Sequence, residues 1–384
     1  MNPTRRNVAA VSAVTLALNL SLAACSRGDL ATSPAATAAT GAPSCPAAFT
    51  KAQATVAAAS STSTTWTGPT TGPKAAANKT IIYVAQTMTN PGVAGAEAGV
   101  AQAAKAIGWK FSVIDGQGTP AGIQAAFSSA IALKPAGIVI GGFDPSSTAA
   151  QVAQANAAGI TLIGWHALGT PGPSTSPKLF TNITTSVAQV AKLSADWVIT
   201  QSRGNGGVVV FTDLSIPFAA SKSQMIKDEL ATCASLKLLS YENIPIADAS
   251  SRVPQEVSSL VSRYGSQWTY SVAINDLYFA DGAAALRAAG LSGGGAPYNI
   301  GAGDGDPSAF QRIEAKQYEA ATVPDPLGQE GWQIIDEFNR SFNGAAASGY
   351  VPEPHLTTAE NAGTASSWDP ANGYQQAYTK IWGK

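Results

Sequence analysis

The residues 80–109, TIIYVAQTMTNPGVAGAEAGVAQAAKAIGW, decide the fold of this chain. The stretch opens with an apolar run, 81–84, which is typical of a buried strand. A polar loop, 86–92, follows it. The alanine-rich segment 93–107 then carries apolar residues at helical spacing, and Gly108 ends the predicted helix. Strand, loop and helix in this order form the first half of a βαβ unit.

The same pattern repeats along the chain. Further predicted strands end at the polar or glycine-rich loops 115–116, 141–145 and 164–166. Strands that alternate with helices at this spacing predict a parallel sheet covered by helices. Because ligands of such sheets bind in the loops beyond the carboxyl ends of the strands, we expect these loops and 86–92 to line a cleft for a small polar molecule.

The pattern breaks at a loop rich in Pro, Gly, Ser and Thr, 169–177, and restarts with a helix over 186–201. New strands are then predicted over 208–211, 237–241, 271–274 and 298–301. Strongly twisted open sheets rarely exceed about ten strands. We therefore expect a second doubly wound lobe rather than one very wide sheet.

Composition and motifs exclude several classes of function. The chain has 384 residues, enough for two domains, and a formal net charge of -1, so no basic field favours nucleic acid. It has no H-E-x-x-H motif and no phosphate-binding loop. Its two histidines, His166 and His355, have no paired Cys/His spacing. We expect no catalytic residue, no metal ion and no cofactor.

The N-terminus has the features of an export signal. Two arginines, Arg5 and Arg6, precede a short apolar run, 8–22, and then the sequence LAAC, 22–25. This ending resembles the lipobox of bacterial lipoproteins, and the apolar run is shorter than the roughly 18 residues of a membrane span. We predict a lipoprotein signal peptide over 1–24, with lipidation of Cys25. A plain signal peptide and a transmembrane anchor are the alternatives.

Residues 25–78 are expected to form a tether and an N-terminal extension with a short helix over 46–59. With Cys25 lipidated, Cys45 and Cys233 remain as an even pair in an oxidising compartment. A disulfide between them would fix the extension to the body of the protein. Two unrelated buried cysteines are the alternative.

Short motifs after the predicted strands carry a family resemblance. They are TNP at 89–91, the strand and loop 138–145, IND at 274–276, GAGDG at 301–305 and VPDP at 323–326. In this order over about 80–356, the chain resembles the type I periplasmic binding proteins, in the sugar-binding branch.

The resemblance implies an α/β fold of two doubly wound parallel-sheet lobes, joined by crossovers near 181–184, 323–327 and 355–358. Lobe one would comprise 79–182 plus 325–354, and lobe two 183–324 plus 355–384. The implied function is that of an extracytoplasmic lipoprotein that closes on a sugar or polyol and delivers it to an ABC permease. We expect a monomer, anchored at the outer face of the cytoplasmic membrane or in the periplasm.

Carried over residue by residue, the sugar contacts fall on Asn90, Asn275, Asp304 and Asp325. A buried carboxylate accepts hydroxyl donors in bonds stronger than neutral ones. For Asn90 the alternative is turn initiation before proline, and for Asp304 the bracing of a glycine-rich loop. Asp276 is expected to cap the helix that follows it.

The chain departs from the ribose-binding pattern at the end of the fourth strand, where Trp165 and His166 replace an Asp-Arg pair. A second expected arginine is not evident near Ser221 and Lys222. Aromatic side chains suit stacking on the apolar face of a pyranose. His166 is either a ligand contact or a solvent-facing loop residue. The remaining predicted contacts are Gln86, Phe143, Asp144 and Phe218, and Tyr278 is a further aromatic candidate.

Two other functions are compatible with this sequence. A receptor that presents its ligand to a sensor kinase or chemoreceptor would use the same cleft. An enzyme acting on a small cyclic substrate is the other alternative. A transcription regulator of this fold is disfavoured by the exported N-terminus.

Overall fold

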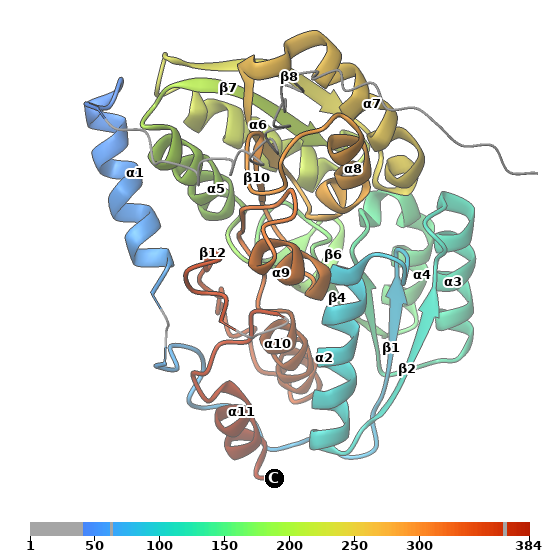
Figure 1. Ribbon diagram of the computed structural model, residues 1–384. Coiled ribbons are helices and arrows are strands. Elements are labelled where there is room, and N and C mark those ends of the chain that lie inside the picture. Colours follow the sequence, from blue (N-terminus) through green and yellow to red (C-terminus); the bar gives the residue numbers. More distant parts are fainter. Residues whose placement is uncertain (1–40, 62–63, 364–366) are drawn as a thin grey trace, which may run out of the picture. The chain divides into compact units, whose positions relative to one another are not determined.

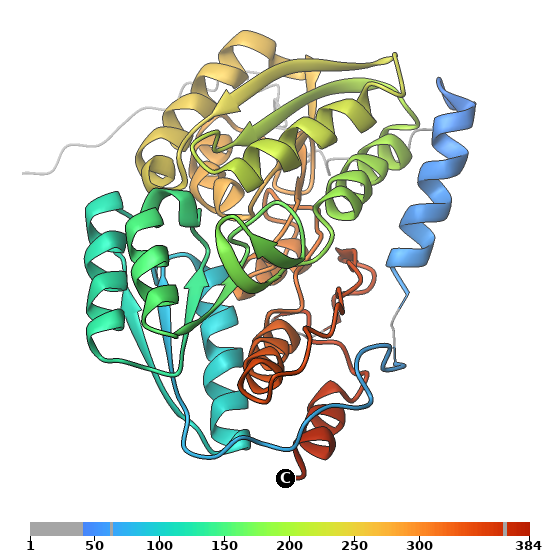
Figure 2. The same ribbon diagram turned by 180° about the vertical axis from the view of Figure 1, so that it is seen from behind.

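The computed structural model describes residues 41–61, 64–363 and 367–384 (Figures 1 and 2). These residues form two lobes, and each lobe is built on a six-stranded, mainly parallel sheet. Helices cover both faces of each sheet (Figure 1). The expected two doubly wound lobes are therefore confirmed.

Lobe one contains the first sheet, with the strand order β2-β1-β3-β4-β6-β5. Its elements are β1 (Thr80–Ala85), α2 (Pro91–Ile107), β2 (Lys110–Asp115), α3 (Pro120–Ala132), β3 (Gly137–Gly141), the 3-10 helix η1 (Pro145–Thr148), α4 (Ala149–Ala157), β4 (Thr161–Trp165), β5 (Gly172–Thr175), β6 (Lys178–Ile183) and, from later in the chain, α10 (Leu327–Phe342). The antiparallel strand β5 lies within a segment that we expected to be a loop.

The opening stretch folds as its sequence predicts. Strand β1 is buried along almost its whole length between β2 and β3, and Gly108 ends α2 in the left-handed conformation. Helix α2 packs against α10 (Figure 1). The two helices approach closely because Gly99 and Gly331 face each other: a Cβ on Gly331 would lie 2.4 Å from the backbone carbon of Gly99. This close packing sets the position of the first turn of α10.

Lobe two contains the second sheet, with the strand order β12-β11-β10-β9-β7-β8. Its elements are α5 (Val187–Ser202), β7 (Gly206–Thr212), α6 (Pro217–Leu230), β8 (Leu236–Asn243), η2 (Ile246–Asp248), α7 (Ala249–Tyr264), η3 (Gly265–Gln267), β9 (Trp268–Ala273), α8 (Leu277–Ala288), β10 (Tyr298–Gly301), α9 (Pro307–Glu314), β11 (Ala321–Thr322) and β12 (Thr357–Thr358). Residues 249–250 form the start of α7, directly after η2.

Three segments of the described chain pass between the two sheets within residues 80–358. They are 184–186 from β6 to α5, 323–326 from β11 to α10, and 343–356 from α10 to β12. The first two are joined by a hydrogen bond of 2.6 Å, in which the Thr185 hydroxyl donates to Asp325 Oδ1.

The C-terminal helix α11 (Tyr374–Trp382) packs on lobe one. The rings of Trp382 and Trp332 stack at 5.5 Å, and both side chains lie in the core shared by α2 and α10. We expected residues 355–384 to belong to lobe two. Strand β12 pairs in the sheet of lobe two, but α11 packs on lobe one instead. The reason is that the apolar side chain against which α11 packs, Trp332, lies on α10. Helix α10 belongs to lobe one, although the segments before and after it in the sequence belong to lobe two.

The N-terminal extension contacts both lobes. Helix α1 (Pro46–Ala59) packs along α5 of lobe two, and Cys45 is joined to Cys233 by a disulfide. Farther along, the carbonyl of Thr71 accepts a hydrogen bond of 2.8 Å from Arg340 of α10 in lobe one. Cys25 lies outside the described residues. The helices of the described ranges all lack the combined length and hydropathy of a membrane-spanning segment.

We expect the disulfide to contribute strongly to stability. It closes a loop with a sequence separation of 188 residues, for which chain entropy predicts about 5 kcal/mol. The double variant Cys45→Ser/Cys233→Ser should lose free energy of unfolding of this order in urea titrations followed by circular dichroism. A reductant should lower the midpoint of the wild type and leave the double variant unchanged. A wild-type midpoint that does not respond to reductant would contradict the assignment.

Candidate functional site

A cavity of about 50 Å³ lies between the lobes at the carboxyl ends of their strands. Lobe one lines it with Gln86, Asn90, Val93, Gly142, Trp165 and His166, and lobe two with Ile216, Phe218, Ala219, Lys222, Ile246, Ile274, Asn275 and Asp304. Seven of the ten side chains named from the sequence as ligand contacts are among these residues.

The other three named side chains lie elsewhere. Phe143 is buried in the core of lobe one, where its ring packs edge-on against Phe127 at 6.3 Å. Asp144 caps η1 by accepting a hydrogen bond of 2.8 Å from the backbone of Ser146. Asp325 is buried beside the cavity rather than in its lining. The predicted cleft is thus less aromatic than expected. Tyr278 is also absent from its lining, because its hydroxyl donates to the Ile244 carbonyl inside lobe two.

Asn90 combines two roles that we had treated as alternatives. Its side-chain oxygen accepts a hydrogen bond of 2.9 Å from the backbone of Gly92, which caps α2. The same side chain is 7% exposed and lines the cavity. Capping fixes the rotamer of the amide, and its nitrogen remains free to face the cavity.

Asn275 and Asp304 meet on the opposite wall. The amide nitrogen of Asn275 donates to Asp304 Oδ2, and its oxygen accepts from the backbone of Leu277 at 2.9 Å. Asn275 therefore caps α8, and the expected capping role of Asp276 is wrong. The Asp276 carboxylate instead accepts a hydrogen bond of 2.7 Å from the backbone of Gly305, which braces the loop that presents Asp304.

Asp304 is held in an unusual environment. Its backbone adopts a left-handed φ of 69°, which non-glycine residues rarely adopt outside functional sites and turns. Its carboxyl group lies so close to α2 of lobe one that a Cβ on Gly92 would be 2.5 Å from Asp304 Oδ2. Burial, and then the charge of Asp325, raise the pKa of Asp304 to about 8. The carboxyl group is therefore largely protonated at neutral pH.

Three rings form a stack across the cavity. Trp165 and His166 stack at 4.1 Å, and His166 and Phe218 at 5.0 Å, which joins lobe one to lobe two. His166 is 8% exposed, and burial lowers its pKa to about 4. The imidazole is therefore neutral at physiological pH, and the solvent-facing alternative is excluded.

Lys222 supplies a buried positive charge that the sequence analysis did not assign to the site. Its ammonium group donates a hydrogen bond of 2.6 Å to the carbonyl of Ala302 and faces Asp325 and Asp304. Burial lowers its pKa. The sequence holds one indication that Lys222 belongs to the site. Lys222 follows the predicted contact Phe218 by four residues and therefore lies on the same face of α6.

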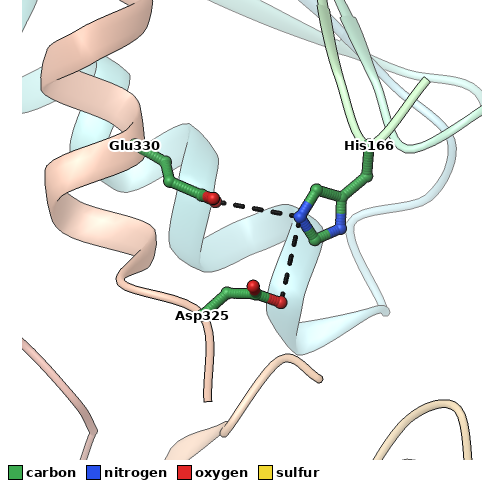
Figure 3. Close-up of side chains that lie close together, drawn as sticks. All are labelled: His166, Asp325 and Glu330. Carbon is green, nitrogen blue, oxygen red and sulfur yellow. Dashed lines mark ion pairs between the residues drawn. The ribbon is translucent and has the colours of Figure 1, made fainter. Parts of the chain in front are cut away.

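Glu330 was also missed. It lies in the first turn of α10, where its Oε2 atom accepts a hydrogen bond of 2.7 Å from the indole of Trp165. Figure 3 shows His166 pointing toward both Glu330 and Asp325. The Nε2 atom of His166 lies 3.8 Å from Asp325 Oδ2 and 3.9 Å from Glu330 Oε2. Burial and the charge of Asp325 raise the pKa of Glu330 well above its usual range.

Comparisons with known proteins agree with this architecture. The periplasmic binding protein domain model matches residues 81–345. A comparison with curated proteins found no match. Among solved structures, an ABC transporter solute-binding protein from Agrobacterium vitis with bound allitol is 18% identical, with a TM-score of 0.63 over 74% of this chain and 97% of that one.

Two further structures have the same fold. The arabinose-transporter binding protein of Shewanella sp. ANA-3, bound to L-arabinofuranose, is 15% identical, with a TM-score of 0.64 over 79% of this chain and 95% of that one. A second Agrobacterium vitis protein, bound to D-tagatopyranose, is 15% identical, with a TM-score of 0.67 over 75% of this chain and 97% of that one. With two doubly wound lobes around a shared cavity and a domain match over most of its length, this chain belongs to the periplasmic binding protein family.

Proposed function

We propose that this protein captures a small sugar or polyol between its lobes and delivers it to an ABC permease. The observation that carries the proposal is the cavity to which both lobes contribute polar and aromatic side chains. Solved structures of the same fold hold allitol, L-arabinofuranose and D-tagatopyranose. The proposed role is binding, without chemical change of the ligand.

The polar side chains suit a ligand with several hydroxyl groups. Asn90 and Asn275 each carry an amide, which offers donors and an acceptor. A protonated Asp304 can donate one hydrogen bond and accept others, so it can act as donor or as acceptor toward a ligand hydroxyl group. Trp165 and Phe218 also line the cavity, where each ring has one face stacked on His166, and aromatic faces of this kind suit the C–H face of a sugar ring.

Capture requires movement of the lobes. The cavity of about 50 Å³ is far smaller than the roughly 300–1,000 Å³ of typical ligand pockets, so a ligand has to enter while the lobes are apart. A ligand that contacts both walls only in the closed form shifts the equilibrium toward that form. The closed form would then dock on the permease.

We further propose that the mature protein is an exported monomer. The lipobox-like sequence at 22–25 supports a lipid on Cys25, which would hold the protein at the outer face of the cytoplasmic membrane or in the periplasm. A lipid anchor would keep the protein close to the permease and so shorten the distance over which it has to diffuse.

Substitutions in the cavity should weaken sugar binding selectively. Asn90→Ser keeps a capping oxygen but removes the amide, and Asp304→Gly removes the carboxyl group at a backbone conformation that glycine favours. Each should lower affinity about 10- to 100-fold, as expected for lost hydrogen bonds. Calorimetry with allitol, L-arabinose, D-tagatose and D-allose would measure this.

The matched control is Asp144→Asn, whose side chain lies outside the cavity lining and should leave affinity unchanged within about twofold. Equal affinities of both cavity variants and the wild type would contradict the proposed site.

Lobe closure should be sensitive to a single methyl group on Gly92. Because that Cβ would lie 2.5 Å from the Asp304 carboxyl group, Gly92→Ala should hold the lobes apart and lower affinity at least about tenfold. Small-angle scattering should then show a smaller decrease in radius of gyration on sugar addition than in the wild type. Gly169→Ala, at a position with open space, is the control. Unchanged closure in Gly92→Ala would contradict the account.

The raised pKa of Asp304 predicts a dependence of stability on pH. The folded protein holds this proton up to pH about 8, whereas an unfolded chain releases it near pH 4. The free energy of unfolding should therefore fall as pH rises between these values, by up to about 1.4 kcal/mol per pH unit from this group. The groups that set this pKa, after burial, are Asp325, Lys222, Asp276 and Asp306.

Asp304→Asn removes the titrating proton and keeps a residue that tolerates the left-handed backbone. Its free energy of unfolding, measured in urea at pH 5 to 8, should fall less steeply than that of the wild type. Parallel curves for the two proteins would show that Asp304 does not hold a proton in the folded state.

A further inference from the structure

We propose that His166, Asp325 and Glu330 form a binding site for one divalent transition-metal ion at the hinge side of the cavity. The three side chains come from the end of β4, from the second crossover and from the first turn of α10. This inference goes beyond sugar capture, and it reverses the sequence-based expectation that the protein holds no metal.

The geometry of the three side chains suits a single ion. Each offers one ligand atom, and these atoms all lie within 4.8 Å of one another. A point therefore exists no farther than about 2.8 Å from all three, so inward shifts of a few tenths of an ångström to just under 1 Å would give ordinary metal–ligand distances. Figure 3 shows the imidazole nitrogen directed toward both carboxyl groups.

Two atoms of the cluster are buried without a hydrogen-bond partner. Among the described residues, no group is hydrogen-bonded to His166 Nε2 or to Glu330 Oε1. Their residues are 8% and 0% exposed. Buried polar atoms in native proteins nearly always have a partner, so an unpartnered nitrogen that faces two carboxyl groups points to a bound ligand. A metal ion between the three side chains would give the nitrogen of His166 a partner.

Other side chains hold the two carboxyl groups in place. The indole of Trp165 donates to Glu330 Oε2, and the hydroxyl of Thr185 donates to Asp325 Oδ1 at 2.6 Å. Hydrogen bonds of this kind orient the ligands in known metal sites. Trp165 at the end of β4 and Thr185 in the crossover 184–186 therefore already hold the two carboxyl groups in place.

Charge also favours a cation. Asp325 and Glu330 are both buried, and Lys222 is a basic side chain that faces them. A dication between the two carboxyl groups would allow both to be charged at once, whereas burial and the charge of Asp325 favour a protonated Glu330 without it. One imidazole with two carboxylates is typical of Zn²⁺ and of Mn²⁺ or Fe²⁺, whereas Ca²⁺ and Mg²⁺ prefer oxygen ligands alone. An ion can reach the cluster from the cavity, because His166 also lines the cavity wall.

The test is calorimetric titration of chelator-treated protein with Zn²⁺, Mn²⁺ and Ca²⁺, without any sugar. We expect one ion per chain, with Zn²⁺ bound tighter than Mn²⁺ and at least about 100-fold tighter than Ca²⁺. Glu330→Gln and Asp325→Asn should each weaken Zn²⁺ binding at least about 100-fold, more than the loss of an outer-shell partner. His355→Gln, which removes the other histidine, should bind Zn²⁺ like the wild type.

No Zn²⁺ or Mn²⁺ binding by the wild type, or equal binding by both carboxyl variants, would overturn the proposal. Because buried substitutions can prevent folding, anomalous scattering from Zn²⁺-soaked wild-type crystals gives a second test. A peak bonded to all three residues supports the site, and a peak elsewhere or none overturns it. Since no sugar is present, failure here would leave the proposed sugar-binding function untouched.

Discussion

The arrangement of this protein depends on a buried carboxylate, Asp325. It lies in the segment that leads from lobe two into α10 and is only 2% exposed. Burial of a charge is costly unless hydrogen bonds and opposite charges compensate. Asp325 accepts hydrogen bonds from the Thr185 hydroxyl and from the backbone of Asp304, and Lys222 faces it. Two crossovers and the loop that presents Asp304 are thereby tied to one side chain.

Because Asp325 lies in a crossover, the ionisable side chains of the cavity lie beside the segments about which the lobes would move. Asp304 and Lys222 belong to lobe two, and His166 belongs to lobe one, yet all three surround Asp325. Their ionisation is consequently coupled: the charge of Asp325 favours a protonated Asp304 and favours a charged Lys222. Ligand hydroxyl groups or a cation that enter here meet a preformed set of donors and acceptors, which lowers the cost of organising the site.

The sequence predicted the framework because local patterns encode it. The apolar run at 81–84 became β1, the helical spacing that follows became α2, and Gly108 ended it. Asn90, Asn275 and Asp304 line the cavity, as expected of loops that parallel strands bring to one edge of a sheet. Phe143 was placed wrongly for the same reason: its position after β3 is right, but its ring points into the core.

Other features depend on packing that no local pattern reveals. Glu330 lies 164 positions after His166, and the packing of α10 against α2, β4 and β6 brings it to the site. The path of α11 depends likewise on Trp332, which lies on a helix that returns to lobe one. Within the cavity, capping by Asn275 rather than Asp276 follows from the bond of Asp276 to Gly305.

The central claim is that side chains of both lobes grip one small ligand. A crystal structure of the protein with the sugar or polyol that most raises its melting temperature would test this directly. The account predicts a single ligand ring whose hydroxyl groups contact Asn90 from lobe one and Asp304 from lobe two. Ligand density at the separate cavity beside His355 and Trp368, or contact with one lobe only, would contradict it.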